Sequence, residues 1–290
     1  MAMEKRKLAY GPLKGRPLGS SFNWDGGLSM KISFAATAVV LSVAVSGCTA
    51  GNQMSAPPGL ILSDDFESTA VGAIPAGFTK TGNIGVEEGV AHSGTHALRV
   101  EPAVRGGRFI SLAPDKVAAI GGEHWGRLYY KIKSPAPLPT GTLIHITLVD
   151  GKATSPLAND VTDVRLAGVL LNPAGEFKYM YNVQPPNGRK EFGPQSKTLQ
   201  KFNDDWTLLE WHADAATQSY EFFVNGKEVT DIAQHKGAGK YEGLELPAAF
   251  QTYSIGFTNY QAATGEGFTV WFDDIALGKN RLGPVRGAAR

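Results

Sequence analysis

Three side chains that could move protons or bind an anion lie on predicted strands in the middle of the chain. His145 falls on the polar side of the alternating segment 143–149, and Arg165 and Tyr181 fall on the next two predicted strands. A histidine or a tyrosine can take or give a proton, and an arginine can neutralise a carboxylate. Together they form a candidate catalytic set for an anionic substrate. The alternatives are that His145 is a packed structural histidine and that Tyr181 belongs to the core.

Four further side chains are candidates for substrate binding. Asn182 follows Tyr181, Glu210 and His212 share one face of a strand, and Tyr260 follows a late strand. Amide, imidazole and phenol groups are suited to hydrogen bonding with a polar ligand. Glu210 would repel a polyanion, so its alternative role is to orient a histidine or an arginine.

Other catalytic classes have less support in the sequence. Glycoside hydrolysis needs two carboxylates that flank the scissile bond, and Glu210 cannot be paired with Asp150 or Asp214 from sequence alone. The nucleophile elbow Gly-x-Ser-x-Gly and the phosphate-binding Gly-Lys-Ser/Thr motif are both absent from the sequence. Hydrolysis is therefore the weaker enzymatic hypothesis, and serine-nucleophile and P-loop chemistry are excluded.

The single cysteine, Cys48, follows a segment typical of a signal peptide. Residues 32–45 are apolar or small, and they come after Met30 and Lys31. As a helix, these 14 residues would cover about 21 Å, less than the roughly 30 Å of a hydrocarbon core. Residues 45–48 resemble a bacterial lipoprotein lipobox, which implies that Cys48 carries the lipid that anchors the protein to a membrane. The alternative is a buried apolar helix with an incidental cysteine.

The signal divides the chain. We expect a non-native upstream extension over 1–29, the signal peptide over 30–47, a flexible tether over 48–59, one domain over 60–283 and a tail over 284–290. Thr49, rather than Asp, after the lipidated cysteine resembles the outer-membrane sorting signal, so we expect a location in the bacterial cell envelope, at the outer membrane.

The charge balance also depends on this division. The whole chain has 28 Lys+Arg and 27 Asp+Glu, for a net charge of +1. Removal of residues 1–47, which hold six basic and two acidic residues, leaves 22 basic and 25 acidic residues. A slightly acidic domain has no basic patch for nucleic acid, so we expect no nucleic-acid partner. With one cysteine, the domain has no internal disulfide.

From residue 60 onwards the chain is a series of short strand candidates separated by Gly, Pro, Asn and Asp. Alternating polarity is clearest over 143–149, and Asn225-Gly226 is the signal of a tight β-hairpin. The only helical signal is a turn at 114–120. About 220 residues of this kind predict an all-β domain, a single jelly-roll sandwich of two antiparallel sheets. The strand candidates are 126–133, 143–149, 164–171, 177–183, 207–213, 220–224, 253–257 and 268–277.

Five short motifs follow one another in this region: His124–Tyr129, Trp206–Trp211, Phe223–Gly226, Val270–Ile275 and Arg281–Gly283. Together they resemble the cellulose-induced-protein family of secreted β-jelly rolls, which is similar in fold to glucuronan and alginate lyases. The resemblance implies a concanavalin-like sandwich with one concave sheet that forms a polysaccharide cleft. The family often has a Cys where this chain has Pro284, so a disulfide of the relatives is absent here.

The same resemblance implies a structural Ca²⁺ site near the chain ends. Glu67 begins the domain, Ser93 lies in an early turn, and Asp273 and Asp274 lie on the last predicted strand. Ca²⁺ prefers six to eight oxygen ligands from carboxylates and carbonyls. A jelly roll that pairs its first and last strands would bring these residues together. The alternative is that the acids are solvated strand ends.

Taken together, the sequence predicts a lipid-anchored, monomeric, polysaccharide-binding protein of the cell envelope. If it is an enzyme, the resemblance implies a polysaccharide lyase that cleaves a uronic-acid polymer by β-elimination, with His145, Arg165 and a tyrosine as its catalytic groups. A non-catalytic carbohydrate-binding or adhesion module is the alternative, and a scaffold lipoprotein without a sugar ligand is a third class. We expect at most two of the four tryptophans after Cys48 to be exposed for sugar stacking.

Overall fold

The computed structural model describes residues 58–235 and 244–285. The chain separates into two compact units, 1–53 and 54–290, and the described residues all belong to the second. The predicted upstream extension, the signal peptide and Cys48 lie outside the described residues. Within these residues, no helix has the length and apolar character needed to cross a bilayer.

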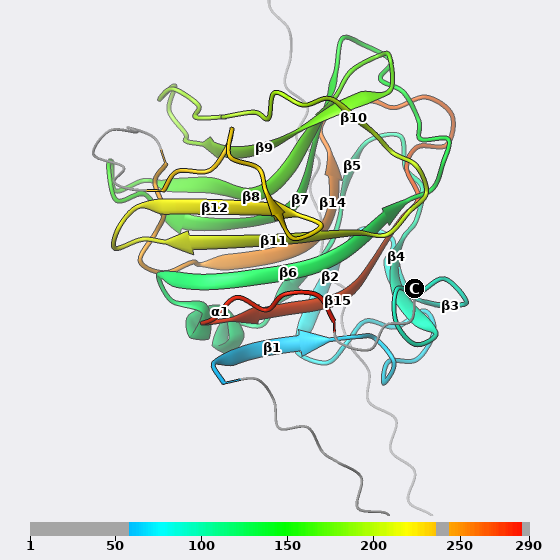
Figure 1. Ribbon diagram of the computed structural model, residues 1–290, viewed down its shortest axis with the longest axis horizontal. Helices are drawn as coiled ribbons and strands as arrows, with labels where there is room; N and C mark the ends of the chain where they lie inside the picture. The colour runs from blue at the N-terminus through cyan, green and yellow to red at the C-terminus, as the bar shows by residue number, and fades with distance from the viewer. Residues whose placement is uncertain (1–57, 236–243, 286–290) are drawn as a thin grey trace, which may run out of the picture. The chain divides into compact units, whose positions relative to one another are not determined.

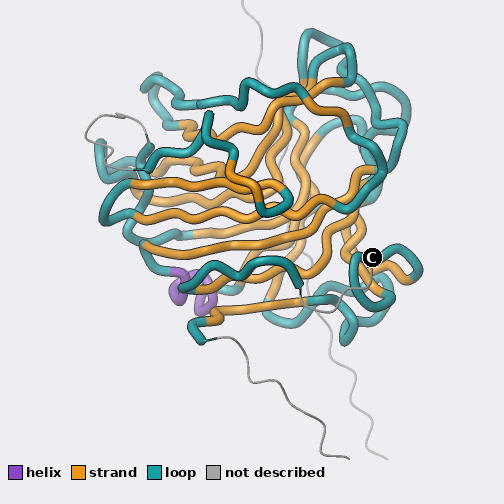
Figure 2. Tube along the Cα trace, viewed as in Figure 1, coloured by secondary structure: helices purple, strands orange, loops and turns teal. Residues whose placement is uncertain are grey.

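Antiparallel strands make up almost all of the regular secondary structure of the described chain (Figures 1 and 2). Sheet A has the order β13-β12-β11-β6-β15-β4-β3, with β1 also paired to β15. Its strands are β1 (Leu60–Asp64), β3 (Ile84–Glu88), β4 (His96–Val100), β6 (Glu123–Ile132), β11 (Thr207–Asp214), β12 (Ser219–Val224), β13 (Lys227–Glu228) and β15 (Val270–Gly278).

Sheet B lies behind sheet A in Figure 1 and has the order β10-β9-β8-β7-β14-β5-β2. Its strands are β2 (Phe78–Thr81), β5 (Gly106–Leu112), β7 (Ile144–Thr154), β8 (Val161–Leu171), β9 (Glu176–Gln184), β10 (Gln200–Lys201) and β14 (Thr252–Asn259). The helix α1 (Pro114–Ile120) has a proline in its first turn and buries Val117 and Ile120. The all-β prediction of two antiparallel sheets is confirmed.

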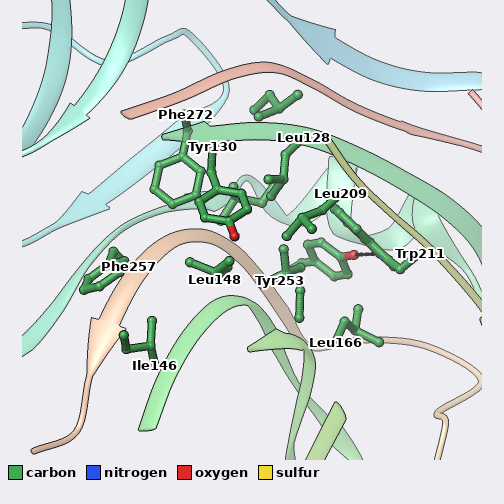
Figure 3. Packing of buried hydrophobic residues seen from close by; sticks show 14 of the residues in the cluster. Leu128, Tyr130, Ile146, Leu148, Leu166, Leu209, Trp211, Tyr253, Phe257 and Phe272 are labelled. Atoms are coloured by element: carbon green, nitrogen blue, oxygen red, sulfur yellow. Dashed lines mark hydrogen bonds between the residues drawn. The ribbon is translucent and has the colours of Figure 1, made fainter. Parts of the chain in front are cut away.

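The core lies between the two sheets, because apolar residues recur at every second position of most strands. Figure 3 shows Leu128, Tyr130 and Leu209 of sheet A facing Leu148 and Tyr253 of sheet B. Aromatic residues with a polar atom are satisfied inside this layer. The Trp211 indole donates to the Tyr253 hydroxyl at 2.9 Å, and the Tyr130 and Tyr179 hydroxyls lie 2.8 Å apart.

All eight predicted strand segments are found, and the hairpin at Asn225-Gly226 has the two positive φ angles, 49° and 77°, that its turn type needs. Short strands at the beginning of the domain, from β1 to β5, were missed. They have four to seven residues each and contain glycine or charged residues that weaken the alternating pattern.

Candidate functional site

The outer face of sheet B carries a continuous row of polar side chains across its strands. The row exists because the paired strands place residues that are far apart in sequence directly opposite one another. Arg165 pairs with Asn182 on one side and with Asp150 on the other, and Asp150 pairs in turn with Ser254. Ser254 pairs with Ser111. We call Asn182, Arg165, Asp150, Ser254 and Ser111 the polar row.

These side chains point away from the core because their strand neighbours point into it. Val164 and Leu166 flank Arg165 in β8, and both are fully buried in the core cluster. In β14 the buried Tyr253 and Ile255 flank Ser254 in the same way. The hydroxyls of Ser254 and Ser111 lie 2.9 Å apart, which confirms that they share one face.

Arg165 is the centre of the row. One of its terminal nitrogens donates to the Asn182 side-chain oxygen at 2.9 Å, and the other lies 3.6 Å from the Asp163 carboxylate. Its guanidinium lies 4.3 Å from the centroid of the Tyr260 ring, in a cation–π contact. Arg165 is only 4% exposed, and its Nε is buried without a hydrogen-bond partner. An unsatisfied buried donor is costly, and a ligand reaches this nitrogen only when the side chains that cover it move.

His145 lies beside this centre, with its ring centroid 5.2 Å from that of Tyr260. It is 9% exposed, and its Nε2 is also buried without a hydrogen-bond partner. Burial, together with the positive charge of Arg165, lowers the pKa of His145 to about 4. The imidazole is therefore neutral at neutral pH. Burial raises the pKa of Tyr260, so its hydroxyl keeps its proton.

Asp150 places a carboxylate next to Arg165 in the row. Burial, and after it the nearby charge of Asp163, raises the pKa of Asp150 to about 6. The row of side chains next to the polar row holds Lys152, Asp163 and Gln184, which line a shallow hollow with Pro185 and Pro186. The outer face of sheet B therefore combines two cations, Arg165 and Lys152, with two carboxylates and several hydrogen-bonding groups.

Tyr181 does not belong to this face, and its predicted catalytic role is wrong. It is fully buried between the sheets, and its hydroxyl donates to the Leu244 carbonyl at 2.5 Å. Alternation along β9 is the reason, because adjacent residues of a strand face opposite sides and Asn182 faces outwards. Tyr260, predicted only as a binding residue, is the tyrosine that lies beside His145 and Arg165.

Glu210 and His212 are also placed differently from the prediction, because they lie on the outer face of sheet A. Glu210 is 1% exposed and accepts hydrogen bonds from Arg281 at 2.9 and 3.2 Å and from the Gly283 amide at 3.0 Å. It holds the C-terminal segment against the sheet. His212 stacks on Trp125, with ring centroids 4.5 Å apart, and contacts Glu221. Neither residue can join a site on sheet B.

The residues predicted to bind calcium are gathered near the chain ends, as expected, but their oxygens are already occupied. Asp273 accepts from the His92 and Ser93 amides at 2.7 and 3.1 Å. Asp274 contacts the His92 ring at 2.6 Å and accepts from the Ser93 hydroxyl at 2.9 Å. Glu67 accepts from the backbone amides of residues 95 and 96, both at 2.7 Å.

This geometry does not fit Ca²⁺, because the turn presents donors to the carboxylates and a Ca²⁺ site needs carbonyl and carboxylate oxygens. Among residues 58–235 and 244–285, the one set of three or more acid or histidine ligand atoms within 4.8 Å of one another is Glu221, Glu228 and His235. Burial and the neighbouring Asp274 charge raise the pKa of Asp273 to about 7, and the hydrogen bonds from the amides of residues 92 and 93 offset only part of this rise. We therefore assign the carboxylates a structural role.

Two tryptophans after Cys48, Trp125 and Trp206, are half-buried, and Trp211 and Trp271 are buried. Trp125 belongs to sheet A, and Trp206 lies just before β11 of the same sheet. Neither belongs to the strands of sheet B. Beside that sheet the half-buried Tyr260, which directly follows β14, contacts the polar row through Arg165.

Comparison with known proteins supports the fold. No protein-family model matches the chain, and no curated protein matches it. Among solved structures, the cellulose-induced protein Cip1 is similar, with a TM-score of 0.51 and 17% identity over 77% of this chain and 100% of that chain. At this identity the likeness shows the fold alone, and it confirms the fold expected from the sequence resemblance.

Two botulinum neurotoxin structures are more distant. The serotype D binding domain has a TM-score of 0.47 and 11% identity, over 78% of this chain and 49% of that chain. The serotype D ligand-binding domain in complex with N-acetylneuraminic acid has a TM-score of 0.45 and 13% identity, over 78% and 48%. The chain spans about half the length of these toxin domains, and nothing about function is taken from them.

Proposed function

We propose that the outer face of sheet B binds a polysaccharide that contains uronic acid. The observation that carries this proposal is that Arg165 Nε and His145 Nε2 are both buried and unpartnered beside Tyr260. Native proteins rarely leave such atoms unsatisfied without a functional reason. A sugar offers hydroxyl and carboxylate groups that would complete these hydrogen bonds.

Arg165 is the group that would recognise a uronate carboxylate. Asn182 and Asp163 hold its two terminal nitrogens, so the orientation of the guanidinium is fixed before a ligand arrives. Because Tyr260 lies over the guanidinium, binding requires the Tyr260 ring to turn aside or to share the contact. The aromatic ring would then be free to stack on the sugar.

The test is glycan affinity of the purified protein, measured by affinity electrophoresis in gels that contain polyuronates or neutral glucans. Arg165→Ala should weaken retention by a polyuronate at least tenfold, whereas Arg105→Ala, which removes an exposed arginine of a loop before β5, should not change it. Equal retention of both variants, or no retention of the unmodified protein by any glycan, would refute the proposal.

A lyase is the second candidate, and it rests on the protonation states of His145 and Tyr260. The neutral imidazole could take the proton from C5 of a uronate, and the electron pair would form the C4–C5 double bond as the C4–O bond breaks. The Tyr260 hydroxyl would then give its proton to the leaving oxygen. Its test is ultraviolet absorbance of the unsaturated product with glucuronan or alginate. Binding without absorbance would leave a carbohydrate-binding module.

The membrane anchor completes the proposal. Lipidation of Cys48 would tether the domain to the bacterial cell envelope, at the outer membrane, through the segment that precedes residue 60. Metabolic labelling with a tagged fatty acid in a bacterial host should mark the unmodified protein and not Cys48→Ser. Labelling of both would exclude Cys48 as the attachment point, and size-exclusion chromatography in detergent tests the expected monomer.

A further inference from the structure

The order of charges along the polar row restricts which polysaccharide sheet B can accept. Its cation and its carboxylate come from neighbouring strands, since Arg165 of β8 pairs directly with Asp150 of β7. The next two positions, Ser254 of β14 and Ser111 of β5, are uncharged. From Asn182 onwards the row therefore offers a neutral position, a positive position, a negative position and two neutral positions in succession.

Neighbouring strands lie about 4.8 Å apart, which is close to the length of one hexose in an extended chain. A glycan that lies along the row would therefore place about one sugar over each strand. The sugar over Arg165 can carry a carboxylate. The sugar over Asp150 cannot, because two carboxylates would meet in a partly buried place where their repulsion is strong.

A second carboxylate reinforces this restriction. Asp163 lies 3.6 Å from Arg165 and lines the hollow beside the row together with Lys152 and Gln184. It is 31% exposed, so it reaches the surface where a ligand would lie. Arg165 and Lys152 are the two cations of this region, and Asp150 and Asp163 balance their charge. The region therefore has no excess positive charge for a run of uronates.

We infer that the preferred ligand is a heteropolysaccharide in which each uronate neighbours a sugar without an acidic group, rather than a homopolymer of uronate. The inference rests on the proposed glycan-binding function of this face. The hydroxyl or amide groups of the uncharged sugar would donate to Asp150, and a further uncharged group would meet the serine hydroxyls.

The experiment compares two kinds of acidic polymer in affinity electrophoresis at pH 7.5. Glucuronan supplies consecutive glucuronates, and hyaluronan and heparosan supply glucuronate that alternates with N-acetylglucosamine through two different linkage types. The protein should bind at least one alternating polymer about tenfold more tightly than glucuronan. We call the ratio of these two affinities the affinity gap. Asp150→Asn should reduce the affinity gap at least fivefold by raising the affinity for glucuronan.

Two controls keep the comparison specific. Asp115→Asn removes one exposed negative charge from α1, on a different element, and should leave the affinity gap unchanged. Asp163→Asn is the second variant, in case Asp150→Asn does not fold. It should also reduce the affinity gap by raising the affinity for glucuronan. Circular dichroism establishes that each variant is folded.

A change of pH tests the same inference without mutation. Acidification from pH 7.5 to pH 5 should tighten glucuronan binding, because Asp150 takes up a proton as the pH falls below about 6, whereas uronates stay ionised. The charged and titratable groups that act on Asp150 are Asp163 and Arg165 of β8, Lys152 of β7, Tyr253 of β14 and Tyr260, which directly follows β14. The tightening should be absent in Asp150→Asn.

The possible outcomes distinguish a failure of the inferred preference for alternating polymers from a failure of the proposed glycan-binding function. If the protein binds glucuronan as tightly as both alternating polymers, or if neither aspartate variant reduces the affinity gap, the inference is wrong while the glycan-binding function stands. If the protein binds none of these polymers, or if Arg165→Ala leaves all affinities unchanged, the proposed function fails and the inference fails with it.

Discussion

One group of buried polar side chains on each sheet can be compared, Glu210, Asp273 and Asp274 on sheet A and Arg165 and His145 on sheet B, and the two groups differ in their hydrogen-bond partners. On sheet A, the carboxylate of Glu210 has three donors from Arg281 and Gly283, and Asp273 and Asp274 are closed by the turn at residues 92 and 93. On sheet B, Arg165 and His145 each keep a buried nitrogen without a partner. Satisfied groups stabilise a fold, whereas unsatisfied ones cost stability and are retained where a ligand completes them.

The largest expected effect is a loss of stability when Glu210 of sheet A loses its hydrogen-bond partner Arg281. Arg281→Ala leaves Glu210 buried with only the Gly283 amide as partner among the groups named above. We expect the free energy of unfolding to fall by about 3 kcal/mol, because loss of one partner strands a buried charge. Chemical denaturation measures this loss. Glycan retention by the folded variant should be unchanged, and a loss of retention would mean that the two faces are coupled.

A smaller and opposite effect on stability is expected on sheet B. His145→Leu removes a buried nitrogen that has no partner, so the free energy of unfolding should stay the same or rise by about 1 kcal/mol. The same variant should lose glycan affinity about tenfold. Leu98→Ala, a fully buried core substitution of sheet A, is the matched comparison and should destabilise by about 3 kcal/mol. Strong destabilisation by His145→Leu would mean that His145 is a packing residue.

The pH dependence of stability sharpens the same comparison. Because the pKa of His145 is lowered to about 4, an unfolded chain takes up a proton between pH 6.5 and pH 4 that the folded chain rejects. The stability that neutral His145 contributes is therefore fully present above pH 6.5 and is lost as the pH falls towards 4. After allowance for solvent screening, we expect the free energy of unfolding to fall by about 1 to 2 kcal/mol over this range.

Denaturation curves of the original protein and His145→Leu at pH 7 and pH 4.5 measure this difference. The variant should lose less stability on acidification. His124, whose pKa burial lowers to about 3, is present in both proteins and contributes equally to each. Parallel losses in the two proteins would show that His145 is protonated normally in the folded state.

The contrast between the faces also explains which parts of the site sequence could predict. Alternation within a single strand predicts which side a residue faces, so His145 was placed on the polar side correctly and Glu210 was placed opposite Trp211 correctly. The same rule, applied to adjacent residues 181 and 182, already implies that Tyr181 and Asn182 cannot share a face.

Strand order, by contrast, depends on contacts between distant segments. Glu210 joined the predicted site because nothing in its own strand says that β11 belongs to sheet A, beside β6, rather than to sheet B. The polar row is hidden for the same reason, because its five residues come from five strands and their alignment depends on register, including the bulges in β7 and β8. Ser111 and Ser254 have no local feature that distinguishes them from other surface serines.

The smallest effect is expected from the addition of Ca²⁺. It tests whether the carboxylates of Glu67, Asp273 and Asp274 are unavailable to an ion, as their hydrogen bonds indicate. Dialysis against a chelator followed by addition of Ca²⁺ should shift the melting temperature by less than about 1 °C, which corresponds to well under 1 kcal/mol for a domain of this size. The reason is that Glu67, Asp273 and Asp274 already accept donors from residues 92–96. A rise of several degrees would mean that this turn rotates its carbonyls towards the carboxylates when the ion binds, as the family resemblance implies. Asp273→Asn would then abolish the rise, and it would separate a specific site from a general effect of Ca²⁺ on an acidic protein.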